Sequence, residues 1–378
     1  MDASHGHGED DIGSKHEAEH ERNNLIPFPA LLNDFFNWMT NVTDLHIHEG
    51  YHISKIPDFS QALRSMPNLT ALKMTGHIDY LQIFDQIITL EQGAALQTLD
   101  ISDVTTGSWD YHDSDRQKVI QKLQEHTGTA PFTRLLAGPT LDVEVLMALV
   151  AWPKCLERFA LHVDSSRIAR HLVYDGSLQP ALDIQKHSLT HLRIEGDYEL
   201  GLSGFDLRDF PCLEHLCLCN ATMSNFNQHP RNKTVVPDLD ARIFAPRLRN
   251  LLWRLPWWLT GKDKMRDFFS RKHEKRLRSL LDMALKLKEE RSDGEWQFEG
   301  IWVQSVLEVP DPLRVKRRRN FDKEMDRLRA LGDEFRPLGI DIRHVPVPEL
   351  KDNSMYIEDS VFEPLDRVWR WDDNFKFL

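Results

Sequence analysis

Three short phrases decide the fold of this chain: LERFAL at residues 156–161, LTHLRI at 189–194 and LEHLCL at 213–218. In each phrase the fourth and sixth residues are apolar, so both point to the same face of a β-strand. The first residue of the phrase is also apolar and stands where the chain enters the strand. A short strand that buries one face needs neighbouring strands at its edges and a cover on that face.

The same phrase recurs along most of the chain. The other copies are VTDLHI at 42–47, LTALKM at 69–74, LQTLDI at 96–101, FTRLLA at 132–137, LRNLLW at 248–253, FEGIWV at 298–303 and FRPLGI at 335–340. Successive copies start between 24 and 50 residues apart, at or above the length of about 20–29 residues of a leucine-rich repeat. The repetition predicts a parallel sheet, because parallel strands need a long return connection each time.

The segments between the phrases favour helices as the return connections. Apolar residues fall at helical spacing in segments 31–39, 58–65, 80–90, 114–125 and 143–151. The longest helical stretch spans 262–291 and carries an apolar stripe beside a basic face, which indicates a repeat helix or a surface for an anionic partner or lipid. We therefore expect an α/β fold: a solenoid with a curved parallel sheet and helices on its convex side.

Phrases such as MPNL at 66–69 and PCLEHL at 211–216 make the chain resemble fungal F-box/leucine-rich-repeat proteins, over about residues 28–345. The resemblance implies an irregular leucine-rich-repeat-like fold. It also implies an F-box that docks the adaptor of a cullin–RING ubiquitin ligase, while the repeats hold the client. Residues 25–40 are one helix long and an F-box is a larger helical module, so we recognise no F-box. A truncated gene model, a protein that works without an F-box and a protein outside the ligases stay open.

Composition divides the chain into three predicted parts. Residues 1–24 form an acidic, His-rich tail that we expect to be disordered. Residues 25–348 form the irregular solenoid, and residues 349–378, acidic but containing four aromatic residues near the end, form a C-terminal cap. We expect an intracellular protein without a membrane span, because the N-terminus lacks an apolar core and four cysteines do not make a disulfide framework.

Residues between and just after the two buried strand positions point to the face of the sheet opposite the helices. Concave faces of solenoids bind proteins, so these residues are the candidate partner-binding set. Its members are His46, His48, Lys73, Thr75, Asp100, Ser102, Leu136, His162, Arg193, Glu195, Cys217, Cys219, Leu252, Arg254, Trp302 and Gln304. Charged, polar and apolar residues alternate in this set, which suits a protein better than a phosphate backbone. The alternative is that they are ordinary solvated strand positions.

A run of five bases in six residues has two interpretations. The run comprises Arg314, Lys316, Arg317, Arg318 and Arg319. After two prolines it indicates an exposed loop and a nuclear-import signal, and otherwise it opens the helix that follows. We expect a cytoplasmic protein, and a nuclear one if the run is an import signal.

Other clusters carry less chemistry. The histidines of the tail and the closely spaced Cys212, Cys217 and Cys219 lack the spacing of a metal site, so we expect no metal or other cofactor. Trp253, together with the pair 257–258, indicates either core packing or a binding hot spot. No motif of a hydrolase, phosphate-binding loop, dinucleotide site or metalloprotease is present, which predicts a non-enzyme.

The sequence thus favours a non-catalytic protein–protein interaction scaffold that uses the concave face of the sheet. The alternative function is the substrate-recognition subunit of a cullin–RING ligase of the F-box type. Nucleic acid is not an expected partner, because the chain carries a net charge of −12.

Overall fold

The computed structural model of this chain describes part of its 378 residues. The described ranges are 40–47, 63–77, 84, 87–88, 95–105, 113–138, 143–163, 178–196, 206–219, 223, 239–255, 269–291, 296–306 and 315–347. The predicted tail 1–24, the predicted cap 349–378 and the expected helix at 31–39 lie outside these residues, as do most of the expected helices at 58–65 and 80–90.

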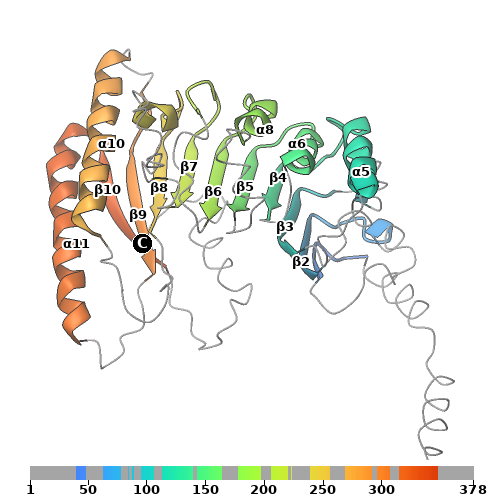
Figure 1. The fold of residues 1–378 in the computed structure, drawn as a ribbon, viewed down its shortest axis with the longest axis horizontal. Helices are drawn as coiled ribbons and strands as arrows, with labels where there is room; N and C mark the ends of the chain where they lie inside the picture. The colour runs from blue at the N-terminus through green and yellow to red at the C-terminus, as the bar shows by residue number, and fades with distance from the viewer. Residues whose placement is uncertain are drawn as a thin grey trace, which may run out of the picture.

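Ten strands of the described chain form one parallel sheet whose spatial order is the order of the sequence (Figure 1). They are β1 Asp44–Ile47, β2 Ala71–His77, β3 Thr98–Thr105, β4 Arg134–Ala137, β5 Arg158–Val163, β6 His191–Gly196, β7 His215–Cys219, β8 Asn250–Arg254, β9 Gly300–Val306 and β10 Asp341–Val347. The predicted α/β fold with a parallel sheet is therefore confirmed, and the arrangement is compatible with a solenoid of strand–helix units.

Nine of the ten phrases coincide with strands, and the tenth prediction is wrong. FRPLGI at 335–340 covers the end of a helix and a short 3-10 turn, and the strand begins only at Asp341. Phe335 and Ile340 are buried there, so the apolar spacing of a strand phrase arises from a helix end followed by a turn. The sheet also continues across the long connection at 255–297, since β8 and β9 pair directly.

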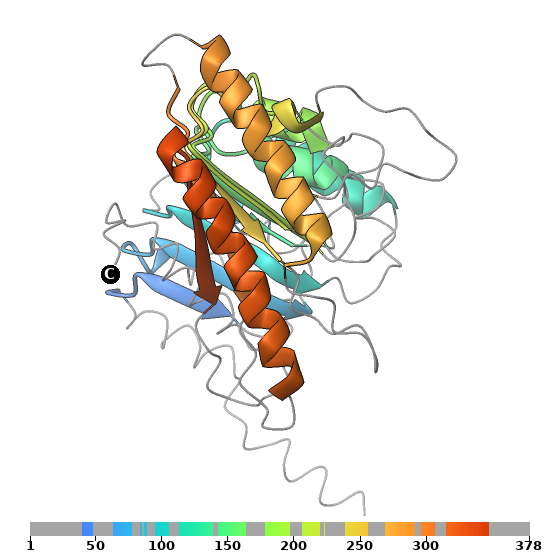
Figure 2. The same cartoon turned by 90° about the vertical axis from the view of Figure 1, so that its left-hand side faces the viewer.

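Helices return the chain between strands on one side of the sheet. They are α5 Asp113–Glu125, α6 Val143–Ala151, α8 Leu178–Ile184, α10 Arg271–Glu290 and α11 Val315–Phe335, with 3-10 turns η3 Leu239–Ile243 and η5 Arg336–Leu338. The predictions at 114–125 and 143–151 are confirmed. Figure 2 shows α10 and α11, the longest of them, side by side at the end of the sheet near β10.

The predicted helix at 262–291 begins later than expected. Ser270 caps α10: its hydroxyl accepts a hydrogen bond from the backbone N–H of His273, and the ring of His273 accepts one from the N–H of Ser270. Such a reciprocal pair ends the non-helical chain and fixes the first helical residue. Residues 262–268 lie outside the described chain.

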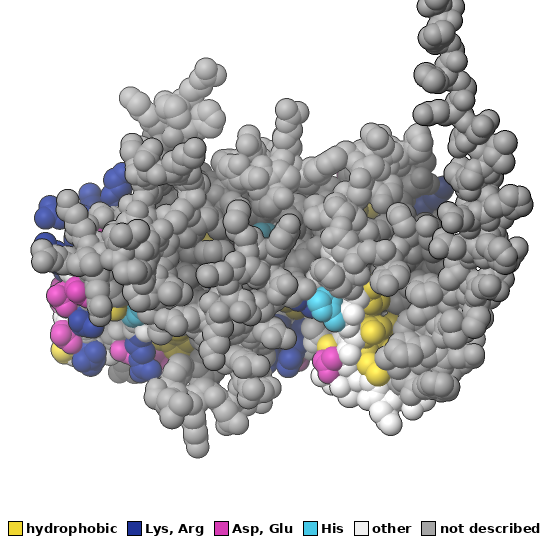
Figure 3. Space-filling view, turned by 90° about the horizontal axis from the view of Figure 1, so that it is seen from below, with side chains coloured by type: hydrophobic (Ala, Val, Ile, Leu, Met, Phe, Trp, Pro, Cys, Tyr) yellow, Lys and Arg dark blue, Asp and Glu magenta, His cyan; other side chains and the backbone are white. Residues whose placement is uncertain are grey.

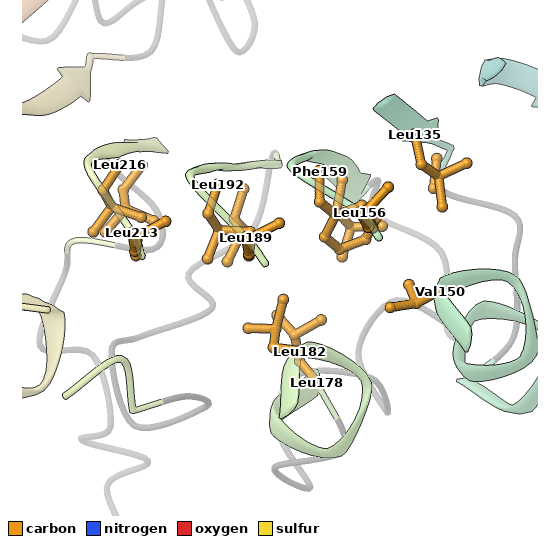
Figure 4. Packing of buried hydrophobic residues seen from close by; sticks show 14 of the residues in the cluster. Leu135, Val150, Leu156, Phe159, Leu178, Leu182, Leu189, Leu192, Leu213 and Leu216 are labelled. Atoms are coloured by element: carbon orange, nitrogen blue, oxygen red, sulfur yellow. The ribbon is translucent and has the colours of Figure 1, made fainter. Parts of the chain in front are cut away.

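One hydrophobic core lies between the sheet and the helices. Strand residues such as Phe159, Leu192 and Leu216 face helix residues such as Leu178 and Leu182 (Figure 4). These side chains are the fourth residues of the strand phrases and the apolar stripe of α8. The core therefore runs through the stack and leaves the other face of the sheet for a different set of side chains.

Candidate partner-binding face

The face of the sheet opposite this core, here called the second face, carries its side chains in rows because the strands pair in register. One row joins His46, Lys73, Asp100, Leu136, Ala160, Arg193, Cys217, Leu252, Trp302 and Arg343 on successive strands. A second row pairs His162 with Glu195, and Arg254 with Gln304, two residues further along the strands. Neighbouring residues of a row are about 4.8 Å apart along the sheet. The predicted set thus shares one face, except His48, which lies outside the described residues.

The first three strands present a polar, partly accessible part of this face. The ring of His46 is exposed and lies 3.2 Å from the hydroxyl of Thr75, which is itself buried. Asp100 accepts hydrogen bonds from the backbone N–H and the hydroxyl of Ser102, at 3.0 and 2.7 Å. Lys73 is half-buried beside them. Polar groups here already have local partners but remain within reach of solvent.

The last strands differ from expectation, because their side chains are buried. Cys217, Leu252 and Trp302, with Val345 packed against them, form a hydrophobic cluster separate from the main core. Leu252 is only 1% exposed and Trp302 8%. The interpretation of these positions as open or solvated is therefore wrong, since other atoms of the chain cover them.

A buried ion cluster borders this apolar group. The guanidinium of Arg193 donates two hydrogen bonds to the carboxylate of Glu195, at 2.7 and 3.0 Å, and Arg254 pairs with the same carboxylate. Two guanidiniums thus share one carboxylate. Burial, and then the charge of Arg193, hold the pKa of Arg254 well below its usual value. The arrangement is short of negative charge.

Two further groups of this region are polar and buried. The side-chain amide of Gln304 is 1% exposed and makes no hydrogen bond. Burial raises the pKa of the Cys217 thiol to about 12, so this cysteine is an unreactive thiol at neutral pH. All four cysteines of the chain are free, and the Cys212 thiol donates to the backbone carbonyl of His187.

The structure also shows a row that the sequence analysis did not select. It lies two residues before the central row and joins Arg134, Arg158, His191, His215 and Asn250 on β4 to β8. The first four of these side chains are half-buried. The signal was present in the third residue of each phrase, which shares the parity of the selected positions, but only the residues after the first buried position were chosen.

The two histidines of this row stack on each other and stay neutral. Their ring centroids are 4.4 Å apart. Burial lowers the pKa of His191 to about 2, helped by the charges of His215, Arg158 and Arg134. Burial also lowers the pKa of His215 to about 4, helped by Arg249 and Arg158. Both rings are therefore uncharged at neutral pH, and the positive charge of the row belongs to its arginines.

The remaining candidates lie elsewhere. Residues 316–319 of the basic run are in the first turns of α11, so the expected loop is wrong there, while Arg314 lies outside the described chain. Trp253 packs in the main core against the ring of His273, which makes packing the role of this tryptophan; residues 257–258 lie outside the described chain.

Comparison with protein-family models, with curated proteins and with solved structures finds no match to this chain. Among the described residues, no group of three or more histidine, cysteine or acidic side chains is placed to hold a metal ion. None of the described helices is long and apolar enough to cross a membrane.

Proposed function

We propose that this protein is a non-catalytic scaffold that binds a protein partner on the second face of its sheet, and that its strand–helix units are irregular leucine-rich repeats. One observation carries the proposal: side chains from ten neighbouring strands lie in register on a face that the core does not use. Such a continuous, chemically mixed surface is the form in which solenoid proteins recognise other proteins.

Accessibility directs the proposal to the first seven strands. His46 is exposed there, and Lys73, Asp100, Leu136 and His162 are half-buried, whereas the selected residues of β8 and β9 are mostly buried. A mixture of charged and apolar groups at this spacing suits hydrogen bonds and apolar contact with a polypeptide.

The test is affinity capture from a native cell extract with wild-type protein and the double variant Lys73→Ala/Leu136→Ala. We expect a protein specifically retained by the wild type to be lost, or reduced about tenfold or more, because both side chains belong to the central row. The matched control is Lys275→Ala/Leu338→Ala, which removes an exposed lysine and an exposed leucine from the helical side.

Equal retention by both double variants would contradict binding on the second face. Probing the captured material for the adaptor of cullin–RING ligases tests the second function. Adaptor recovered by the wild type would favour a substrate-recognition subunit over a scaffold outside the ubiquitin system.

A further inference from the structure

Positive charge gathers on the second face between β4 and β9. The rows of these strands hold four arginines against one carboxylate, Glu195, although the whole chain carries a net charge of −12. The arginines are Arg134, Arg158, Arg193 and Arg254. Three histidines lie among them. The sign of this part of the face is therefore opposite to that of the protein.

The carboxylate is already bound inside the face. Glu195 accepts from Arg193 and pairs with Arg254, so its charge is shared by two guanidiniums. Arg134 and Arg158, in contrast, are direct register partners on adjacent strands. Like charges opposite each other in a sheet repel, and a nearby anion removes that cost.

Seen from below the view of Figure 1, basic and histidine side chains lie next to one another near the middle of the molecule (Figure 3). The row that begins with Arg134 and Arg158 continues as His191 and His215, which are neutral at neutral pH and stacked. Flat neutral rings beside guanidiniums offer contact area without further charge. The half-buried Leu136 and Ala160 of the next row add apolar contact.

We infer that an acidic stretch of polypeptide from a protein partner binds across β4–β7, with its carboxylates on Arg134 and Arg158 and its neighbouring residues over His191 and His215. The inference rests on the proposed function and names the chemistry of the partner. A guanidinium matches a carboxylate as a two-pronged donor.

The size of the row agrees with this partner. Four adjacent strands span about 14 Å from the first to the last, and about four or five residues of extended chain cover that length. Phosphate backbones are instead followed by broad arrays of basic side chains. Here Glu195 and the apolar residues of the next row interrupt such an array.

The test measures binding of a fluorescently labelled oligoglutamate peptide to the full chain at low salt. We expect Arg134→Gln/Arg158→Gln to weaken binding by about tenfold or more, since each lost pair is a charge-assisted hydrogen bond. The matched control, Arg329→Gln/Arg336→Gln, removes the same charge from exposed arginines of α11 and η5. It should leave binding within about twofold of the wild type.

Several outcomes would overturn the inference. Equal weakening by both double variants would mean general charge attraction, and stronger binding of a single-stranded oligonucleotide through the same arginines would mean a nucleic-acid partner. Peptide binding that appears only after the seven acidic residues of segment 1–24 are replaced by their amides would make this chain's own tail the occupant. If Lys73→Ala/Leu136→Ala abolishes partner capture but the Arg134/Arg158 variant does not, the scaffold function stands and the acidic partner is wrong.

Discussion

Single residues of the central row show how strongly neighbours decide what a side chain can do. His191 and His215 carry the same ring as the exposed His46, yet burial and three nearby arginines keep them neutral. A protonated ring in this position would add a charge where guanidiniums already lie close. Acid should therefore act on the stability of the protein through these two residues.

The pH dependence follows from the direction of the shift. The pKa of His215 is about 4 in the folded protein, below its ordinary value of 6.5, so the unfolded chain binds more protons between these pH values. Stability is fully present above pH 6.5 and falls as the pH drops toward about 4, by up to about 1.4 kcal/mol per pH unit for this residue. We expect His215→Gln to flatten the wild-type pH dependence of urea unfolding in this window, and exposed His187→Gln to leave it unchanged. An identical slope in wild type and His215→Gln would contradict the neutral ring.

The strands could be read from the sequence, because a buried side chain at every second residue leaves a repeated signature. Leu192 and Ile194, for example, are predicted and are fully buried. The tenth phrase fails because Phe335 is buried at a helix end, where spacing alone does not distinguish helix from strand. Alternation also assigns residues to the second face, but it carries no information on what covers them. The burial of Leu252 and Gln304 therefore could not be predicted.

Other contributions to the fold depend on contacts between distant residues. Gln185 is buried, and its side chain bonds the backbone of Val150, Pro153 and Leu156 and the hydroxyl of Ser188. It thus joins the end of α6, the turn before β5 and the turn before β6. No spacing pattern marks a single glutamine for this role, since polar residues in such turns are expected to be solvated.

Close strand pairing makes one glycine critical for an element. A Cβ at Gly300 would overlap the backbone carbonyl of Asp341 on the adjoining strand. Gly300→Ala should therefore lower the free energy of unfolding by about 1–3 kcal/mol and speed amide hydrogen exchange in β10.

Gly128→Ala serves as the comparison for this substitution. The space around Gly128 is open, and its φ of 72° makes the cost purely conformational. This variant should leave exchange in β10 at the wild-type rate. Unchanged exchange in β10 of Gly300→Ala would show that the two strands are not in close contact at this point.

At the scale of the whole molecule, strands contact only their neighbours in the described sheet, since its spatial order is its sequence order. Leu99 of β3 and Ile301 of β9 are both fully buried and lie far apart in that order. We expect Leu99→Ala and Ile301→Ala each to cost about 2–5 kcal/mol, because each leaves a cavity in the core. In hydrogen exchange, the first variant should loosen β2–β4 and the second β8–β10. A uniform rise over the sheet in either variant would contradict this local response.

The same strand order has a consequence during synthesis on the ribosome. Each strand pairs with the one made just before it, so β1 and β2 can join while β3 is still being translated. Assembly can proceed from the N-terminal end in step with elongation, and no early strand has to wait for a distant partner. Until the final unit emerges, the nascent chain carries a single open sheet edge that advances with translation, and that edge is where a chaperone would protect it.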